Sequence, residues 1–128
     1  AVKSFTATKS GEKDQGTFKI IFEAISFIED LRIDNSCKID GLDSPGQGIE
    51  YTIGNTETIS CKLSTDTPND KDTPYTFELE ENKARTFTLT VVASAPKVGS
   101  TPISLAINSV NFGRETDDTN ANYYKMGL

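Results

Sequence analysis

The chain has 128 residues and no histidine, and its 13 lysines and arginines against 19 aspartates and glutamates give a formal net charge of −6. An acidic chain lacks the basic surface that nucleic acid phosphates require, so we expect no nucleic acid partner. Without histidine, Ser-His-Asp and Cys-His nucleophile arrangements are impossible within the chain, and we expect no enzyme activity.

The length fits one domain with one hydrophobic core, which we expect to span residues 1–128. Threonine supplies 16 residues and serine 11. Their hydroxyls compete with helical backbone hydrogen bonds, which favours strands and turns. No apolar run reaches the about 18 residues of a membrane-spanning helix, so we expect no direct membrane insertion by this chain.

Residues 2–8 predict a first short strand, and the polar residues 9–16 predict a loop. The following apolar segment, residues 18–28, fits two patterns. A period of two places four residues on one face, as in a strand: Phe18, Ile20, Phe22 and Ala24. A period of 3.6 aligns another apolar stripe, as in a helix. The density of isoleucine and phenylalanine favours the strand, and a helix over 18–28 is the alternative.

Residues 31–39 predict a strand with an irregularity at Asn35–Ser36. After a turn-rich loop at 41–48, two alternating runs, 49–53 and 59–63, flank Gly54–Asn55. Gly-Asn between alternating runs is typical of a type II′ turn, so these two runs are predicted to pair as a hairpin.

Residues 75–79 and 86–94 predict two further strands, and the second alternates almost without error. Its apolar face consists of Phe87, Leu89, Val91 and Ala93. The apolar parity then changes between 103–107 and 110–112, which predicts a bulge near Asn108–Ser109. The polar segment 113–128 is either an edge strand or a tail. The whole pattern predicts an antiparallel β-sandwich of about seven to nine strands.

The two cysteines, Cys37 and Cys61, share the parity of their apolar neighbours and so point inward. The simplest interpretation is a disulfide between two strands, with two reduced buried thiols as the alternative. On the chain-entropy model a bridge of this loop length contributes about 3.5 kcal/mol. A disulfide indicates an oxidising compartment and therefore a secreted or cell-surface protein.

Two acidic loops are weak candidates for a calcium site, because calcium prefers several oxygen ligands. The candidate residues are Asp66, Asp70 and Asp72 in the first loop and Asp117 and Asp118 in the second. Residues 118–122 of the second loop match the opening of an EF-hand loop, but Tyr123 occupies the glycine position, which excludes an EF-hand. No other metal or cofactor is expected. Sugar binding requires exposed aromatic side chains, and Tyr51 and Tyr75 share parity with core residues, so both are predicted to be packed.

The segment ENKARTFTLTVVASAPKVGSTPISLAINSVNFG, residues 81–113, resembles immunoglobulin-like β-sandwich domains of prokaryotic surface and appendage-associated proteins. The opening VKSFTAT is similar to the first strand of such domains. The resemblance implies an extracellular structural or interaction role in a cell-surface, S-layer-associated or pilus-like assembly. It carries no functional residues to this chain, and no tryptophan accompanies the cysteines as it does in antibody domains.

Three functions remain open from the sequence. The first is a noncatalytic module that binds protein at the cell surface through loops 40–48, 64–74 and 113–122. The second is a filament or pilus subunit that self-associates by exchanging an edge strand, with residues 2–8 as the donor. The third is a calcium- or carbohydrate-binding β-sandwich.

Overall fold

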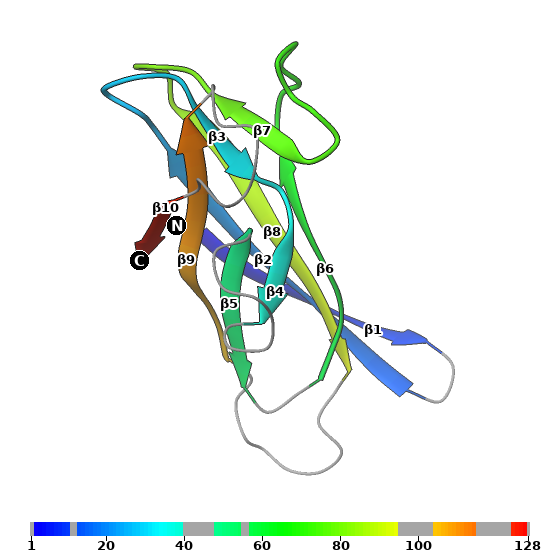
Figure 1. The fold of residues 1–128 in the computed structure, drawn as a ribbon. Coiled ribbons are helices and arrows are strands. Elements are labelled where there is room, and N and C mark those ends of the chain that lie inside the picture. Colours follow the sequence, from blue (N-terminus) through cyan, green and yellow to red (C-terminus); the bar gives the residue numbers. More distant parts are fainter. Residues whose placement is uncertain are drawn as a thin grey trace.

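The computed structural model describes residues 2–10, 13–39, 48–54, 57–94, 104–114 and 124–127. These residues form ten β-strands and no helix, which confirms the all-β prediction. Accordingly, this part of the chain contains no helix long and apolar enough to cross a membrane. The strands lie in two sheets that face each other in a sandwich-like arrangement (Figure 1).

The first sheet has four antiparallel strands in the order β1-β2-β8-β6. Their bounds are β1 (Val2–Ser10), β2 (Lys13–Ala24), β8 (Arg85–Ser94) and β6 (Glu57–Thr65). β1 and β2 pair from Val2–Ile21 to Ser10–Lys13, so residues 9–10 and 13–16, which were predicted to lie in a loop, belong to the two strands. β1 lies at the edge of this sheet.

The second sheet has six strands, with β9 at its centre. Their bounds are β3 (Leu31–Asp34), β4 (Cys37–Ile39), β5 (Ile49–Gly54), β7 (Thr76–Leu79), β9 (Ser104–Arg114) and β10 (Tyr124–Gly127). All pairs are antiparallel except β4–β5, which is parallel. Phe112 pairs with Tyr124 of β10 and with Ile33 of β3, so β10 and β3 lie on opposite edges of β9.

The hydrophobic core lies between the two sheets and is filled by alternate residues of both. Its buried members are Ile20, Ile33, Ile49, Tyr51, Leu63, Leu79, Phe87, Leu89, Val91, Leu105 and Val110. Full burial of a large apolar side chain contributes about 1.5–3 kcal/mol, so this layer supplies the main stabilisation of the two sheets. The predicted inward parity of residues 86–94 is confirmed.

The helix considered for residues 18–28 is wrong. β2 is extended through Ala24, and residues 25–30 form the connection to β3. The reason is tertiary: Phe18 to Ala24 pair with β8 on one side of β2, which only an extended chain can do.

Both predicted strand irregularities are present. In the β5–β9 pair, Glu50 lies opposite Ser109 and Tyr51 lies opposite Ile107, so Asn108 is the extra residue of a bulge. The run 31–39 is interrupted after Asp34, whose carboxylate accepts a hydrogen bond from the Ser36 backbone N–H at 2.8 Å. This interruption divides one predicted strand into β3 and β4. It partly explains why the structure has ten strands where about seven to nine were predicted.

Beyond the interruption, β5 lies between β4 and β9 in the sheet. The Ile49 N–H donates to the Ser36 carbonyl at 2.7 Å, and the Asn111 N–H donates to the Gly48 carbonyl at 3.1 Å. Gly48 has φ +73°, and a Cβ there would lie 2.3 Å from the Ser36 carbonyl oxygen, so only glycine fits.

The predicted hairpin around Gly54 is wrong. β5 pairs with β4 and β9 in the second sheet, whereas β6 pairs with β8 in the first sheet. The chain therefore changes sheets between these strands. Alternation shows which side of a strand is buried but not which sheet contains the strand, and Asn55 lies outside the described residues.

The predicted disulfide joins Cys37 of β4 to Cys61 of β6, with the two Cα atoms 6.1 Å apart. These strands belong to different sheets, so the bridge fastens one layer of the sandwich to the other. Both cysteines are partly buried against the hydrophobic core, as their parity predicts.

Candidate interaction surface

The loop between β2 and β3 exposes large apolar side chains to solvent. Phe27 is 70% exposed and Ile28 is 85% exposed, while Ile25 is 41% exposed. Single exposed apolar residues are common on protein surfaces, but adjacent ones mark candidate contact sites. We call residues 25–30 the apolar loop.

The apolar loop is held in place by hydrogen bonds to the connection between β7 and β8. The Asn82 N–H donates to the Ser26 carbonyl at 2.6 Å, and the Glu81 N–H donates to Asp30 Oδ1 at 2.7 Å. The buried Ser26 hydroxyl donates to the Glu29 carbonyl at 2.6 Å. Ser26 is therefore buried against the rest of the molecule, whereas Phe27 and Ile28 extend into solvent.

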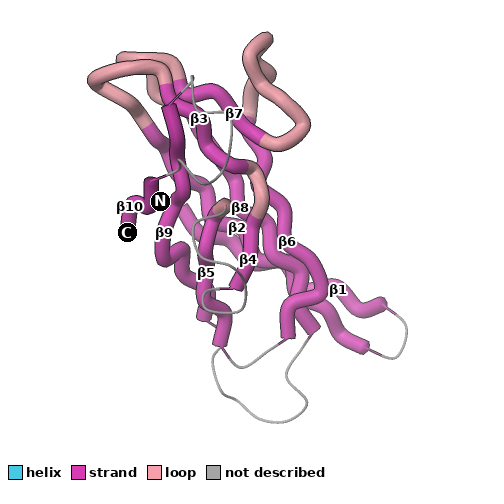
Figure 2. The backbone as a smooth tube through the Cα atoms, viewed as in Figure 1, coloured by secondary structure: helices cyan, strands magenta, loops and turns pink. Residues whose placement is uncertain are grey.

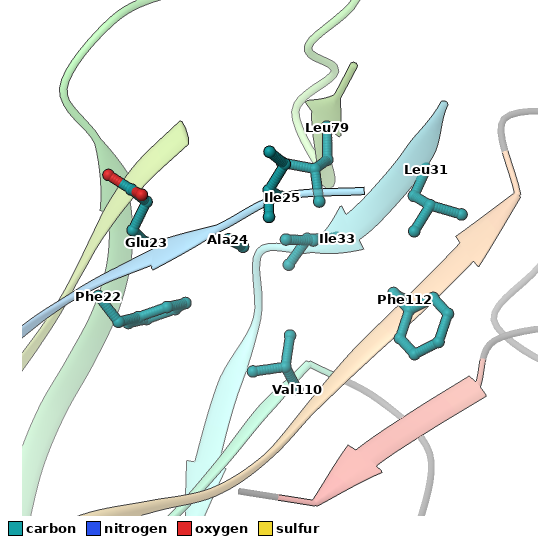
Figure 3. A pocket seen from close by; sticks show the side chains of 9 residues that line it. All are labelled: Phe22, Glu23, Ala24, Ile25, Leu31, Ile33, Leu79, Val110 and Phe112. Atoms are coloured by element: carbon teal, nitrogen blue, oxygen red, sulfur yellow. The ribbon is translucent and has the colours of Figure 1, made fainter. Parts of the chain in front are cut away.

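A cavity of about 310 Å³ lies beside this loop, between the two sheets (Figure 3). Ile25 belongs both to the apolar loop and to the cavity wall, so the two features are continuous. The carboxylate of Glu23 points away from the apolar side chains that surround the cavity. The lining residues are Phe22, Glu23, Ala24, Ile25, Leu31, Ile33, Leu79, Val110 and Phe112.

Acidic residues are frequent in the apolar loop and in the segments that precede it or are hydrogen-bonded to it. We call these residues the acidic rim, which consists of Glu23, Glu29, Asp30, Glu80 and Glu81. Two lysines accompany it: Lys71 Nζ lies 3.7 Å from Asp30 Oδ2, and Lys83 Nζ lies 2.5 Å from Glu80 Oε2. The hydrogen bond from Lys83 lowers the pKa of Glu80. Two of the five carboxylates of the rim, those of Asp30 and Glu80, are thus paired with lysines.

In the described structure, hydrogen bonds to Asp72 hold the first acidic loop, residues 66–75, against β7 and β8. Both oxygens of Asp72 accept hydrogen bonds from the Arg85 guanidinium, at 2.8 and 2.6 Å. The Glu78 and Asn69 backbone N–H groups also donate to this carboxylate. These hydrogen bonds, that from Arg85 above all, lower the pKa of Asp72.

The calcium candidates do not come together among the described residues. Asp66 and Asp70 are exposed, and Asp72 is engaged by Arg85. No group of three or more carboxylate or thiol side chains within the described ranges is arranged to hold a metal ion. Asp117 and Asp118 lie outside those ranges.

The tyrosines follow the sequence prediction in one case only. Tyr51 is buried as predicted, whereas Tyr75 is 77% exposed. β7 begins at Thr76, so Tyr75 precedes the strand and the parity argument does not apply to it. Tyr123 and the side chain of Tyr124 lie outside the described part of the chain.

The apolar loop was not predicted from the sequence. The loops predicted to carry recognition are 40–48, 64–74 and 113–122, of which the structure describes the second together with Gly48 and residues 113–114. The available signal was the loss of alternation after Ala24: Ile25, Phe27 and Ile28 follow neither parity, and two acidic residues come next. Comparison with protein-family models, with characterised proteins and with solved structures finds no match to this chain.

Proposed function

We propose that this chain is a noncatalytic, immunoglobulin-like β-sandwich module of a prokaryotic cell-surface or appendage assembly, and that it binds a protein partner through the apolar loop. The observation that carries the proposal is the exposure of Phe27 and Ile28 on a loop fixed by hydrogen bonds. A few preorganised aromatic and aliphatic side chains supply most of the energy of a protein interface.

Two further observations support the extracellular part of the proposal. The disulfide between Cys37 and Cys61 is of the kind that persists in secreted and surface proteins. The two facing sheets agree with the resemblance of residues 81–113 to surface β-sandwich domains. Rigid sandwiches of this class carry recognition on their connecting loops.

The proposal is tested by the double substitution Phe27→Ser and Ile28→Ser. Surface proteins of the producing cells are crosslinked to the chain, the captured partner is purified, and its affinity is measured by titration calorimetry. We expect the double variant to bind at least about 30-fold more weakly, the usual loss at a central interface residue. Tyr75→Ser is the matched control, because Tyr75 is equally exposed but lies on another loop. Equal affinity of the double variant and the wild type would refute the proposal.

A second candidate is a filament subunit assembled by strand exchange. It is favoured by the position of β1, which is both the first strand in sequence and the edge strand of its sheet. In the described structure β1 pairs with β2 of its own chain over nine residue pairs. Exchange therefore requires this pairing to be replaced by the same pairing between neighbouring copies.

A further inference from the structure

We infer that the loop at residues 66–75 guards the outer edge of β7, and that a second copy of this chain adds to β7 as a neighbouring strand once the loop is displaced. β7 is the last strand at one end of its sheet, in the order β4-β5-β9-β3-β7 (Figure 1). An edge strand offers backbone groups with which another strand can pair. This inference goes beyond the proposed function, because it concerns self-association and does not involve Phe27 or Ile28.

The backbone groups of successive residues of β7 point alternately toward β3 and away from it. Phe77 is paired with β3, and the Tyr75 carbonyl accepts a hydrogen bond at 3.0 Å from the N–H of Asn35, which follows β3. The N–H and carbonyl groups of Thr76 and Glu78 therefore point outward. A further strand would have to pair with these outward-facing groups.

The loop and Arg85 occupy each of these outward-facing groups. The Thr76 N–H donates to Thr73 Oγ1 at 3.0 Å, and the Thr73 N–H donates to the Thr76 carbonyl at 3.0 Å. The Glu78 N–H donates to Asp72 Oδ1 at 2.9 Å, and Arg85 Nη1 donates to the Glu78 carbonyl at 2.6 Å. Arg85 also holds Asp72 in place through its ion pair. These contacts replace the hydrogen bonds of a neighbouring strand, so no strand can add to β7 while the loop is in place.

The sequence of β7 is complementary to itself, which identifies the added strand as β7 of a second copy. An antiparallel pairing symmetric about Phe77 places Thr76 of each copy opposite Glu78 of the other, so the outward-facing groups of both residues find backbone partners. The Phe77 side chains then lie opposite each other, and cross-strand aromatic pairs are favourable. The like-charged Glu78 side chains do not oppose each other in this register. A two-fold pairing closes on itself, so the product is a dimer and not a filament.

The test removes the guard by the triple substitution Asp72→Ala, Thr73→Ala and Arg85→Met. Both members of the ion pair are replaced together, so neither charge is left without its partner. The double substitution Asp70→Ala and Lys71→Ala is the matched control, because both residues are exposed in the same loop. Sedimentation equilibrium measures the molecular mass at protein concentrations up to about 1 mM, in about 0.5 M salt, which screens the net charge of −6.

We expect the triple variant to form dimers at the highest concentrations, because one short strand pair makes a small and weak interface. The wild type and the control should remain monomeric throughout. Dimer formation should also slow the hydrogen exchange of the Thr76 and Glu78 amides as the concentration of the triple variant rises. A folded triple variant that remains a monomer would overturn the inference, and so would an association that leaves these two amides unprotected.

If the triple variant does not fold, hydrogen exchange of the wild type decides. We expect the protection factors of the Thr76 and Glu78 amides to be at least about tenfold lower than that of the Phe77 amide. The reason is that displacement of the loop exposes the first two amides while β7 stays paired with β3. Equal protection of all three amides would show that the loop does not separate from β7, and the inference would then be wrong.

Discussion

The Arg85 guanidinium contacts the loop at residues 66–75, the strand β7 and a ring of its own strand β8. It pairs with Asp72 in the 66–75 loop, with Nη2 of Arg85 2.6 Å from Oδ2 of Asp72. It also donates to the backbone carbonyls of Glu78 and Thr67. On its apolar side it lies over the rings of Phe77 and Phe87, 5.6 and 5.8 Å from their centroids. A planar group with five donors can satisfy all these partners at once, which lysine cannot.

This arrangement makes stability depend on the charge of Asp72. The pKa of Asp72 is lower in the folded chain than in the unfolded chain, so the ion pair stabilises the fold fully above the unfolded value. That stabilisation is lost as the pH falls through the folded value. We expect the free energy of unfolding to decrease below about pH 4 in the wild type. Asp72→Asn should lower it by about 1–3 kcal/mol at pH 7 and remove this part of the acid dependence.

Urea unfolding between pH 2 and 7 measures this effect. Asp70→Asn is the control, because Asp70 is an exposed residue of the same loop. An Asp72→Asn variant with the same stability and the same pH profile as the wild type would show that the ion pair contributes nothing.

At the scale of strands, alternation predicted burial but not the assignment of strands to sheets. The inward face of residues 86–94 and the bulge at Asn108 followed from parity, because a change of parity needs one extra residue. The β5–β6 connection could not be predicted from parity. The sequence of Gly54 and its flanking runs is compatible both with a hairpin within one sheet and with a crossing to the other sheet. The pairing partner is decided by contacts far apart in sequence, such as that between β5 and β9.

The disulfide could be predicted from the sequence, whereas the candidate interaction surface could not. The disulfide followed from the parity of Cys37 and Cys61, two residues that both had to face the core. The apolar loop did not follow, because Phe27 and Ile28 are the residue types that normally continue a strand. They lie instead in a loop whose Asp30 and Ser26 accept hydrogen bonds from the backbone of Glu81 and Asn82, more than 50 residues away.

The bridge between β4 and β6 leads to a prediction for the whole sandwich. The double substitution Cys37→Ser and Cys61→Ser should destabilise the chain by about 3.5 kcal/mol, because it removes a cross-link that closes a loop with a sequence separation of 24. For a chain of this length the melting temperature should fall by about 10 °C or more. Calorimetric melts with and without a reducing agent measure both effects.

The wild type with a reducing agent is the internal control for this prediction. Reduction should lower the melting temperature of the wild type to that of the double variant and leave the variant unchanged. Two cysteines that are freely alkylated in the native protein would contradict both the bridge and the extracellular location inferred from it.

At the scale of the molecule, the longer described loops lie at one end of the sandwich (Figure 2). These are the apolar loop, the loop at residues 66–75 and the connection at 80–84. Lys71 and Asp30 join the first two, and Glu81 and Asp30 join the first and the third. These contacts between loops fix the end of the sandwich that carries the apolar loop. A fixed surface favours binding without a change of shape.

The oligomeric state separates the two proposed functions. We expect light scattering at micromolar concentration to show a monomer, because β1 is paired within its own chain and the net charge of −6 opposes contact between identical acidic rims. A chain that assembles by strand exchange would instead form polymers that grow with concentration. Deletion of residues 1–9 would abolish such polymers but would leave a contact through Phe27 and Ile28 intact. Concentration-dependent polymers that are lost with this deletion would thus favour the filament subunit over the interaction module. A monomer over the whole concentration range would favour the interaction module, because the apolar loop then remains available to a different protein.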